Sequence, residues 1–171
     1  MQDAANQDEV AGAGRGYVDK FDLNGNFVER VASAGTLDAP WGMAIAPSSF
    51  GAMAGNLLVG NFGDGHITVY DSNHNFASLG QVMGANNLPL AVDGLWAISP
   101  GTDAVAGSSH VLYFTAGPND EAHGLFGVLT PVPEPSTYMM MFAGLGVLVV
   151  AIRRRTLRTE MERSWVGTYP V

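Results

Sequence analysis

The chain has 171 residues, no cysteine and a formal net charge of −8 at pH 7. The acidic charge is concentrated in the first 134 residues, which contain 14 Asp and Glu but only 3 Lys and Arg; this excludes nucleic acid and an anionic membrane surface as partners of that part, because both bind cationic protein surfaces. The absence of cysteine excludes a disulfide framework and a thiolate metal site.

Residues 1–15 are polar and acidic, and they contain neither the basic nor the apolar region of a secretory signal peptide. We therefore expect this segment to be disordered. Because the C-terminal features described below require export, the sequence predicts either a longer natural reading frame or a different natural start.

The segment from residue 16 to residue 130 is typical of short β-strands separated by turns. Apolar and polar residues alternate in 17–21 and 66–70, as in strands with one covered face, and Asn24-Gly25 and Gly63-Asp64-Gly65 are turn sequences. The more continuously apolar 43–46 and 57–59 are typical of inner strands covered on both faces. The pattern predicts groups of two, four and three strands within 16–32, 41–83 and 94–130.

These groups repeat one another. Residues 16–27 match 65–76 at an offset of 49, with Gly, Asp, Asn, Asn and Phe in common. Residues 41–47 match 94–100, and 57–61 match 111–115, at offsets of 53 and 54, while 124–130 begins a third copy of the strand at 65–71. Periods near 50 residues with four strands per period are typical of β-propeller blades.

The fold class that follows is mainly β, a partial β-propeller of about two to two and a half blades over residues 16–131, followed by one C-terminal transmembrane helix. Because propellers close with four to eight blades, we expect the open ends to expose apolar faces and unpaired strand edges, and we interpret the propeller as part of a larger one.

The repeats also resemble a family of uncharacterised bacterial proteins with NHL-like propellers. The resemblance covers residues 16–131 and is carried by the following segments: Ala39-Pro40-Trp41-Gly42, residues 58–65, Asp93-Gly94-Leu95-Trp96, and residues 114–127. It implies fold and destination; no activity follows from it.

The densest group of titratable side chains is Asp120, Glu121 and His123. Two carboxylates and an imidazole are candidates for metal binding or acid–base chemistry, although an ordinary inter-strand loop explains them as well. The repeated Asp-x-Asn-x-Asn at Asp22 and Asp71 resembles the opening of a calcium loop, but we interpret both as Asx turns, because neither continues with the glycine and glutamate of such a loop. We likewise interpret Asp64 as part of a Gly-Asp-Gly turn and His66 as the outward-facing strand residue that follows it.

Four aromatic residues fall in or beside the apolar strands, namely Trp41, Phe62, Trp96 and Phe114. They are candidates for a groove that stacks on glycans, but the sequence favours packing in the core.

The C-terminal segment has three consecutive parts. Pro133, Glu134 and Pro135 fix an extended backbone that presents one carboxylate. The uncharged residues 138–152 predict a short transmembrane helix, and Arg153, Arg154 and Arg155 form a basic stop expected on the cytoplasmic side. Residues 156–171 are then a cytoplasmic tail.

Residues 132–155 closely resemble the PEP-CTERM sorting signal of Gram-negative bacteria, which some catalogues label an ice-binding-protein C-terminal domain. The resemblance implies recognition of Pro133, Glu134 and Pro135 by an exosortase, an integral membrane enzyme, and release of the preceding domain to the cell surface. The chain departs from the family in its tail of sixteen residues after the arginines.

The sequence therefore favours a non-enzymatic surface or matrix protein, held in the inner membrane during sorting, without a cofactor. Its expected partners are an exosortase and the inner membrane, with extracellular polysaccharide as a further candidate. Two alternatives stay open: a propeller enzyme of hydrolase or lyase type with a cation near Asp120, Glu121 and His123, or a truncated inactive product.

Overall fold

The structure is a computed structural model that describes residues 4–5, 9–131, 145–148 and 152–153. The chain divides into two compact units, Met1–Pro131 and Val132–Val171, which are described separately. The strands of the described residues all lie in the first unit.

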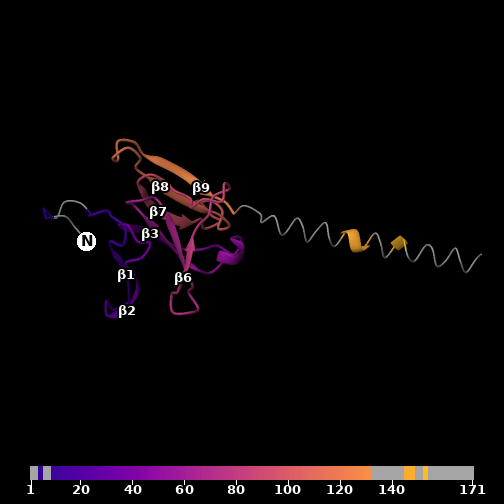
Figure 1. Cartoon of the computed structure of the whole chain (residues 1–171), viewed down its shortest axis with the longest axis horizontal. Coiled ribbons are helices and arrows are strands. Elements are labelled where there is room, and N and C mark those ends of the chain that lie inside the picture. The colour runs from indigo at the N-terminus through magenta and orange to yellow at the C-terminus, as the bar shows by residue number, and fades with distance from the viewer. Residues whose placement is uncertain (1–3, 6–8, 132–144, 149–151, 154–171) are drawn as a thin grey trace, which may run out of the picture. The chain divides into compact units, whose positions relative to one another are not determined.

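The first unit consists of three antiparallel sheets whose strands follow one another in chain order (Figure 1). The first sheet contains β1 (Tyr17–Phe21) and β2 (Phe27–Ser33). The second contains β3 (Pro40–Ile45), β4 (Leu57–Asn61), β5 (Ile67–Tyr70) and β6 (Ser78–Gln81), with the 3₁₀ helix η1 (Gly51–Met53) between its first two strands. The third contains β7 (Leu95–Pro100), β8 (Leu112–Ala116) and β9 (Leu125–Leu129). The mainly β class and the groups of two, four and three strands are confirmed.

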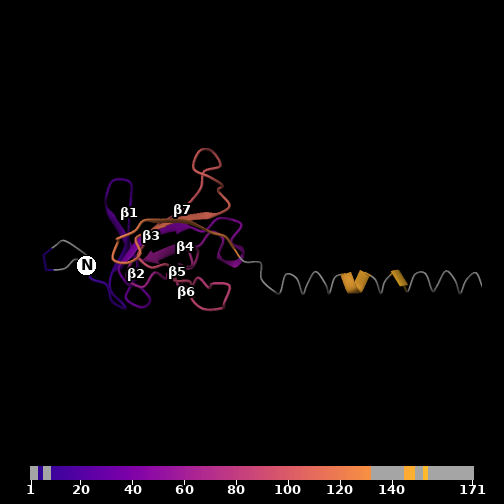
Figure 2. The ribbon, with the colours of Figure 1, turned by 90° about the horizontal axis from the view of Figure 1, so that it is seen from above.

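The second sheet lies between the other two and has a core on each face (Figure 2). Alternate residues of a strand point to opposite faces, so Val59 and Tyr70 pack with Val18 of the first sheet, whereas Leu58 and Val69 pack toward the third. The larger core lies between the second and third sheets. Its fully buried members include Leu58, Ile67, Leu95 and Leu112.

Glycines set the close approach of the second and third sheets. A Cβ atom on Gly42 of β3 would lie 2.8 Å from the backbone oxygen of Trp96 and 2.9 Å from Cα of Ala97, and one on Gly60 would lie 2.7 Å from Leu95 Cδ2. Side chains at these positions would force the sheets apart, so the inner strands β3 and β7 pack almost backbone to backbone.

The burial of the inner strands differs in part from the prediction that both are covered on two faces. β4 and β5 are covered on both faces, but β3 is not, because Trp41, Met43 and Ile45 are more than half exposed. The expectation that both 43–46 and 57–59 are covered on both sides is therefore wrong for β3. The first sheet has no strand over this part of β3, since its two strands cover Leu57, Val59 and Tyr70 instead.

Part of the N-terminal segment that we expected to be disordered is bonded to the folded unit. The backbone N–H of Gly14 donates to the Leu37 carbonyl at 2.7 Å, and that of Gly12 donates to Asp38 Oδ1 at 2.6 Å.

In the second unit the structure describes helix at 145–148 and 152–153. The transmembrane helix predicted for 138–152 lies mostly outside the described residues. Within the described part of the chain, no helix has the length and apolar character needed to cross a membrane.

Candidate functional site

Most of the predicted sorting residues lie outside the part of the chain that the structure describes. Pro133, Glu134, Pro135, Arg154 and Arg155 belong to the undescribed segments, and Arg153 is described as helical. The geometry available for a site is therefore that of the first unit.

Strand pairing fixes which residues of the second and third sheets are equivalent. In the second sheet, Pro40 pairs with Asn61 and Gly42 pairs with Gly60, and a bulge lies between these two pairs. In the third sheet, Leu95 pairs with Ala116 and Ala97 pairs with Thr115, with a bulge at the same position. From Pro40 to Leu95, and from Asn61 to Ala116, the offset is 55 residues. The offsets of 53 and 54 predicted from the sequence were thus one or two residues short. Short apolar strands align almost equally well when one is shifted by a residue or two against the other.

The loops that follow these strands differ in length. β5 and β9 are equivalent at an offset of 59, since Ile67 pairs with Gly60 as Phe126 pairs with Thr115. Between equivalent paired positions, the connection from β8 to β9 is thus four residues longer than the connection from β4 to β5. Long loops on a rigid sheet are common places for binding residues.

The inserted residues form a left-handed turn. Asn119, Asp120 and Glu121 have φ angles of 57°, 51° and 61°, and the Glu121 N–H donates to the Gly117 carbonyl at 3.1 Å. Left-handed backbone costs a non-glycine residue roughly 1–2 kcal/mol, less for Asn and Asp, so three in succession need support from their surroundings.

Trp96 and Asp93 provide that support. The Trp96 indole N–H donates to Glu121 Oε1 at 2.8 Å, and the Asn119 backbone N–H donates to Asp93 Oδ2 at 3.1 Å. Gly117 makes room for the indole, because a Cβ there would lie 2.3 Å from its Cζ2 atom. The loop therefore holds an indole, a carboxylate and an amide in a fixed arrangement at one end of the third sheet.

The structure does not bring the three candidate side chains Asp120, Glu121 and His123 together into one group. Among the described residues, no three His, Asp or Glu side chains are grouped closely enough to hold a metal ion. Glu121 is engaged with Trp96 instead, a pairing that the sequence analysis missed. Because 25 residues separate the two side chains, only the strand register could have revealed it.

The two Asp-x-Asn-x-Asn sequences are Asx turns, as predicted. Asp22 Oδ1 accepts the backbone N–H groups of Asn24 and Asn26 at 2.9 and 2.8 Å. Asp71 Oδ1 accepts the Asn73 N–H at 2.8 Å, and Asp71 Oδ2 lies 2.7 Å from His74 Nδ1. The Asn26 side-chain amide also donates to Asp22 Oδ2, at 2.9 Å. Hydrogen bonds lower the pKa of both aspartates, chiefly the bond from this amide for Asp22 and the bond from the Asn73 N–H for Asp71.

Asp64 lies in the predicted Gly-Asp-Gly turn, and His66 follows it as a bridge residue that pairs with Ala91. Asp64 Oδ1 accepts the His66 N–H at 3.0 Å, and His66 Nδ1 lies 2.9 Å from the Leu90 carbonyl oxygen. Asp64 also holds the buried Asn61, whose Nδ2 donates to it at 3.0 Å.

The four aromatic candidates do not form one groove. Phe114 packs against the larger core, as favoured, but Trp41 is 58% exposed and contacts Phe62, with ring centroids 6.4 Å apart. The expectation of core packing is therefore wrong for Trp41. Its indole lies on the uncovered face of β3.

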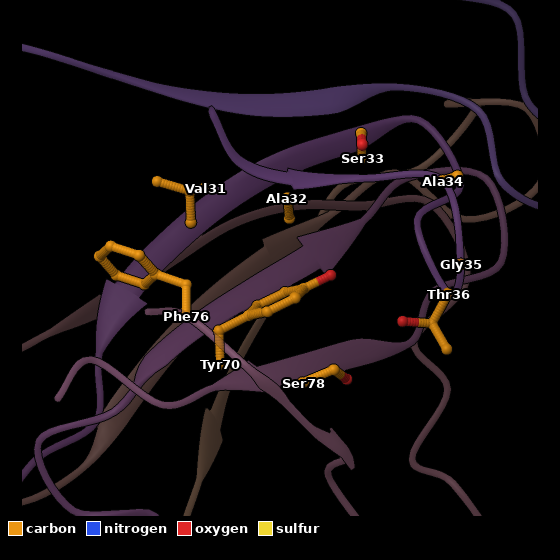
Figure 3. Close-up of a pocket in the computed structure, with 9 residues that line it drawn as sticks. All are labelled: Val31, Ala32, Ser33, Ala34, Gly35, Thr36, Tyr70, Phe76 and Ser78. Atoms are coloured by element: carbon orange, nitrogen blue, oxygen red, sulfur yellow. The ribbon is translucent and has the colours of Figure 1, made fainter. Parts of the chain in front are cut away.

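A cavity of about 330 Å³ opens between the first and second sheets (Figure 3). Val31 and Phe76 lie at one end, and the Tyr70 ring crosses the middle with its hydroxyl directed toward the side where Thr36 lies. Burial raises the pKa of Tyr70, while a hydrogen bond with the Thr36 side chain opposes the rise. No sequence pattern indicated this cavity, because its lining comes from three separate segments.

Comparisons with known proteins give one family match. Residues 131–155 match the family model of the PEP-CTERM protein-sorting motif. The chain therefore carries this sorting motif, which implies an exosortase as its processing partner and membrane passage followed by surface export.

The chain is also similar to uncharacterised proteins of Acanthamoeba polyphaga mimivirus. It is 40% identical to protein L690 over 117 residues, which are 68% of this chain and 29% of the relative. It is 38% identical to protein R648 over 119 residues, which are 69% of this chain and 28% of that relative. The matched region thus spans less than a third of either relative. No solved structure matches the chain.

Proposed function

We propose that this chain is an exported, non-enzymatic surface or matrix protein of a Gram-negative bacterium. In this proposal an exosortase reads Pro133, Glu134 and Pro135 while residues 138–152 sit in the inner membrane with Arg153 to Arg155 on the cytoplasmic side. Release then delivers the folded first unit to the cell surface.

The observation that carries this proposal is the position of the motif. The family match starts at residue 131, and β9, the final strand of the third sheet, ends at Leu129. In this proposal the signal begins just after the final strand in sequence, so its recognition does not require the sheet to unfold.

The first unit is, in this proposal, part of an NHL-like β-propeller. Its support is the 55-residue repeat with a conserved bulge position and the stacking of successive sheets face to face. The length of one relative agrees with this proposal. Because 117 residues make up 29% of protein L690, that protein has about 400 residues, which is enough for about seven repeats of this length.

The role we assign to the propeller is binding or scaffolding. The support is the inserted loop, which fixes Trp96 and Glu121 at one end of the third sheet. An indole beside a carboxylate suits neutral, hydroxyl-rich ligands such as extracellular polysaccharide, since the face of the ring supplies stacking area and the acid accepts hydrogen bonds.

Two epitope tags test the sorting step. One is inserted at residue 10 and the other follows Val171, and the full chain is expressed, with an export signal, in a host with an active exosortase. We expect the surface form to keep the first tag and lose the second. A variant with Pro133, Glu134 and Pro135 all changed to alanine should keep both, and retention of both tags by the unchanged protein would refute the proposal.

A further inference from the structure

Equivalent positions of the second and third sheets differ sharply in burial. At the offset of 55, Met43 of β3 corresponds to Ile98 of β7. Ile98 is 4% exposed and belongs to the core between the sheets, whereas Met43 is 53% exposed. The same position in the repeat is thus covered once and uncovered once.

What covers Ile98 is the hairpin of β3 and β4. Gly42 approaches the β7 backbone at Trp96 and Ala97, and Ala44 and Leu58 pack in the same core as Ile98. Among the described residues no such hairpin lies over Met43, and β1 pairs only with β2, so the other edge of β1 is unpaired there. The face of β3 and the edge of β1 together outline a place for two strands.

We propose that this place binds a two-stranded β-hairpin from another repeat of the same kind. The hairpin adds to the edge of β1 and lays a face like that of β3 and β4 over Trp41, Met43 and Ile45. The inference rests on the repeat architecture of the proposed function and is independent of the sorting step.

The contacts specify the chemistry of the hairpin. It needs glycine or alanine where β3 and β4 have Gly42 and Gly60, because larger side chains at those positions would meet the facing backbone and side chains within 3 Å. It needs branched apolar residues between them, as Leu58 is, to cover the apolar side chains of β3.

A second copy of this chain does not fit the place. In such a copy the face of β3 and β4 is already covered by its own third sheet. The outer face of that third sheet has Tyr113 and Thr115 at the positions equivalent to Leu58 and Gly60 of the β3–β4 hairpin. Tyr113 also stacks on Phe126, with ring centroids 5.7 Å apart. This face therefore lacks the small residue that the proposed docking needs. The relatives, with about 400 residues, have length for further repeats.

Disulfide trapping tests the inference cleanly, because the chain has no cysteine. The probe is a synthetic peptide of residues 39–62 with Ala44→Cys, activated as a mixed disulfide. It is mixed with the full-length chain carrying Met43→Cys. The matched control is the full-length chain carrying Val128→Cys, which is 46% exposed on the outer face of the third sheet.

We expect about tenfold more trapped product at Met43→Cys than at Val128→Cys, the ratio that about 1.4 kcal/mol of selective docking gives. A peptide that also carries Gly42→Val and Gly60→Val should lose this selectivity. Equal trapping at both sites, trapping that the valine peptide retains, or a dimer of the unmodified chain in sizing would each overturn the inference. None of these results bears on the loss of the C-terminal tag, so the two proposals fail separately.

Discussion

The second and third sheets share one plan and have different neighbours. Their inner strands carry the same bulge and the same pairing, so β3 and β7 are copies in register. Within the described part of the chain, the second sheet is covered on two faces and the third on one, and this difference changes the burial of equivalent side chains. Position in the repeat sets the register, whereas burial depends on the next sheet.

The loops of these two sheets teach a second lesson. The loop between β4 and β5 is a tight Gly-Asp-Gly turn in which Asp64 accepts a backbone N–H, and the equivalent loop in the third sheet adds four residues and a left-handed turn. The repeat tolerates the insertion because Gly117 leaves space for Trp96, where the second sheet has Phe62 against Trp41. Variation is thus concentrated at one end of an otherwise repeated sheet.

The sharpest test of the comparison is one substitution made at two equivalent sites. Val69 of β5 is 3% exposed, and its equivalent in β9, Val128, is 46% exposed. We expect Val69→Ala to lower the free energy of unfolding by about 2 kcal/mol, from lost burial and the cavity left behind, and Val128→Ala by less than about 1 kcal/mol. Urea denaturation of the full chain measures both.

Equal losses at Val69 and Val128 would contradict the comparison. That result would mean that the outer face of the third sheet is covered in solution as fully as the inner one.

Strand grouping was predictable from sequence because it depends on local signals. Alternation at 17–21 and 66–70, together with turn sequences such as Asn24-Gly25, marks strands and their ends without reference to the rest of the chain. The Asx turns were predictable for the same reason, since each aspartate bonds to residues two to four positions away.

Coverage and long-range pairing were not predictable in this way. An apolar run such as Met43 to Ala46 looks the same whether a sheet covers it or not, so the exposure of Met43 could not be read from it. The bond between Trp96 and Glu121 and the cavity beside Tyr70 depend on how separate segments are placed, which requires the exact register.

A second, smaller effect tests the left-handed turn that distinguishes the third sheet. Asp120 has a φ of 51°, which glycine adopts freely and a β-branched residue does not. We expect Asp120→Gly to raise the free energy of unfolding by up to about 1 kcal/mol, and Asp120→Val to lower it by about 1 kcal/mol. If urea denaturation finds the valine variant as stable as the glycine variant, residue 120 does not hold a left-handed backbone.

The smallest effect concerns the Asx turns that the first two sheets share. The pKa of Asp22 is lowered, first by the Asn26 side-chain amide and then by backbone N–H groups. A carboxyl whose pKa is lowered by folding stabilises the protein above its unfolded pKa, about 3.9, and that contribution is lost as the pH falls through the lower, folded value. The thermal midpoint of the unchanged chain should therefore fall more steeply below about pH 4 than that of Asp22→Asn.

Asn26→Ala is the control for this pH dependence. It keeps the Asp22 carboxyl but removes the side-chain amide that lowers its pKa most, so the carboxyl titrates closer to its unfolded value. We expect its midpoint to fall less steeply with acid than that of the unchanged chain, in the same direction as for Asp22→Asn. Because Asp22 is exposed, the difference should be small and should shrink further in high salt. Parallel curves for all three proteins at low salt would show that the turn holds its aspartate no more tightly than the unfolded chain does.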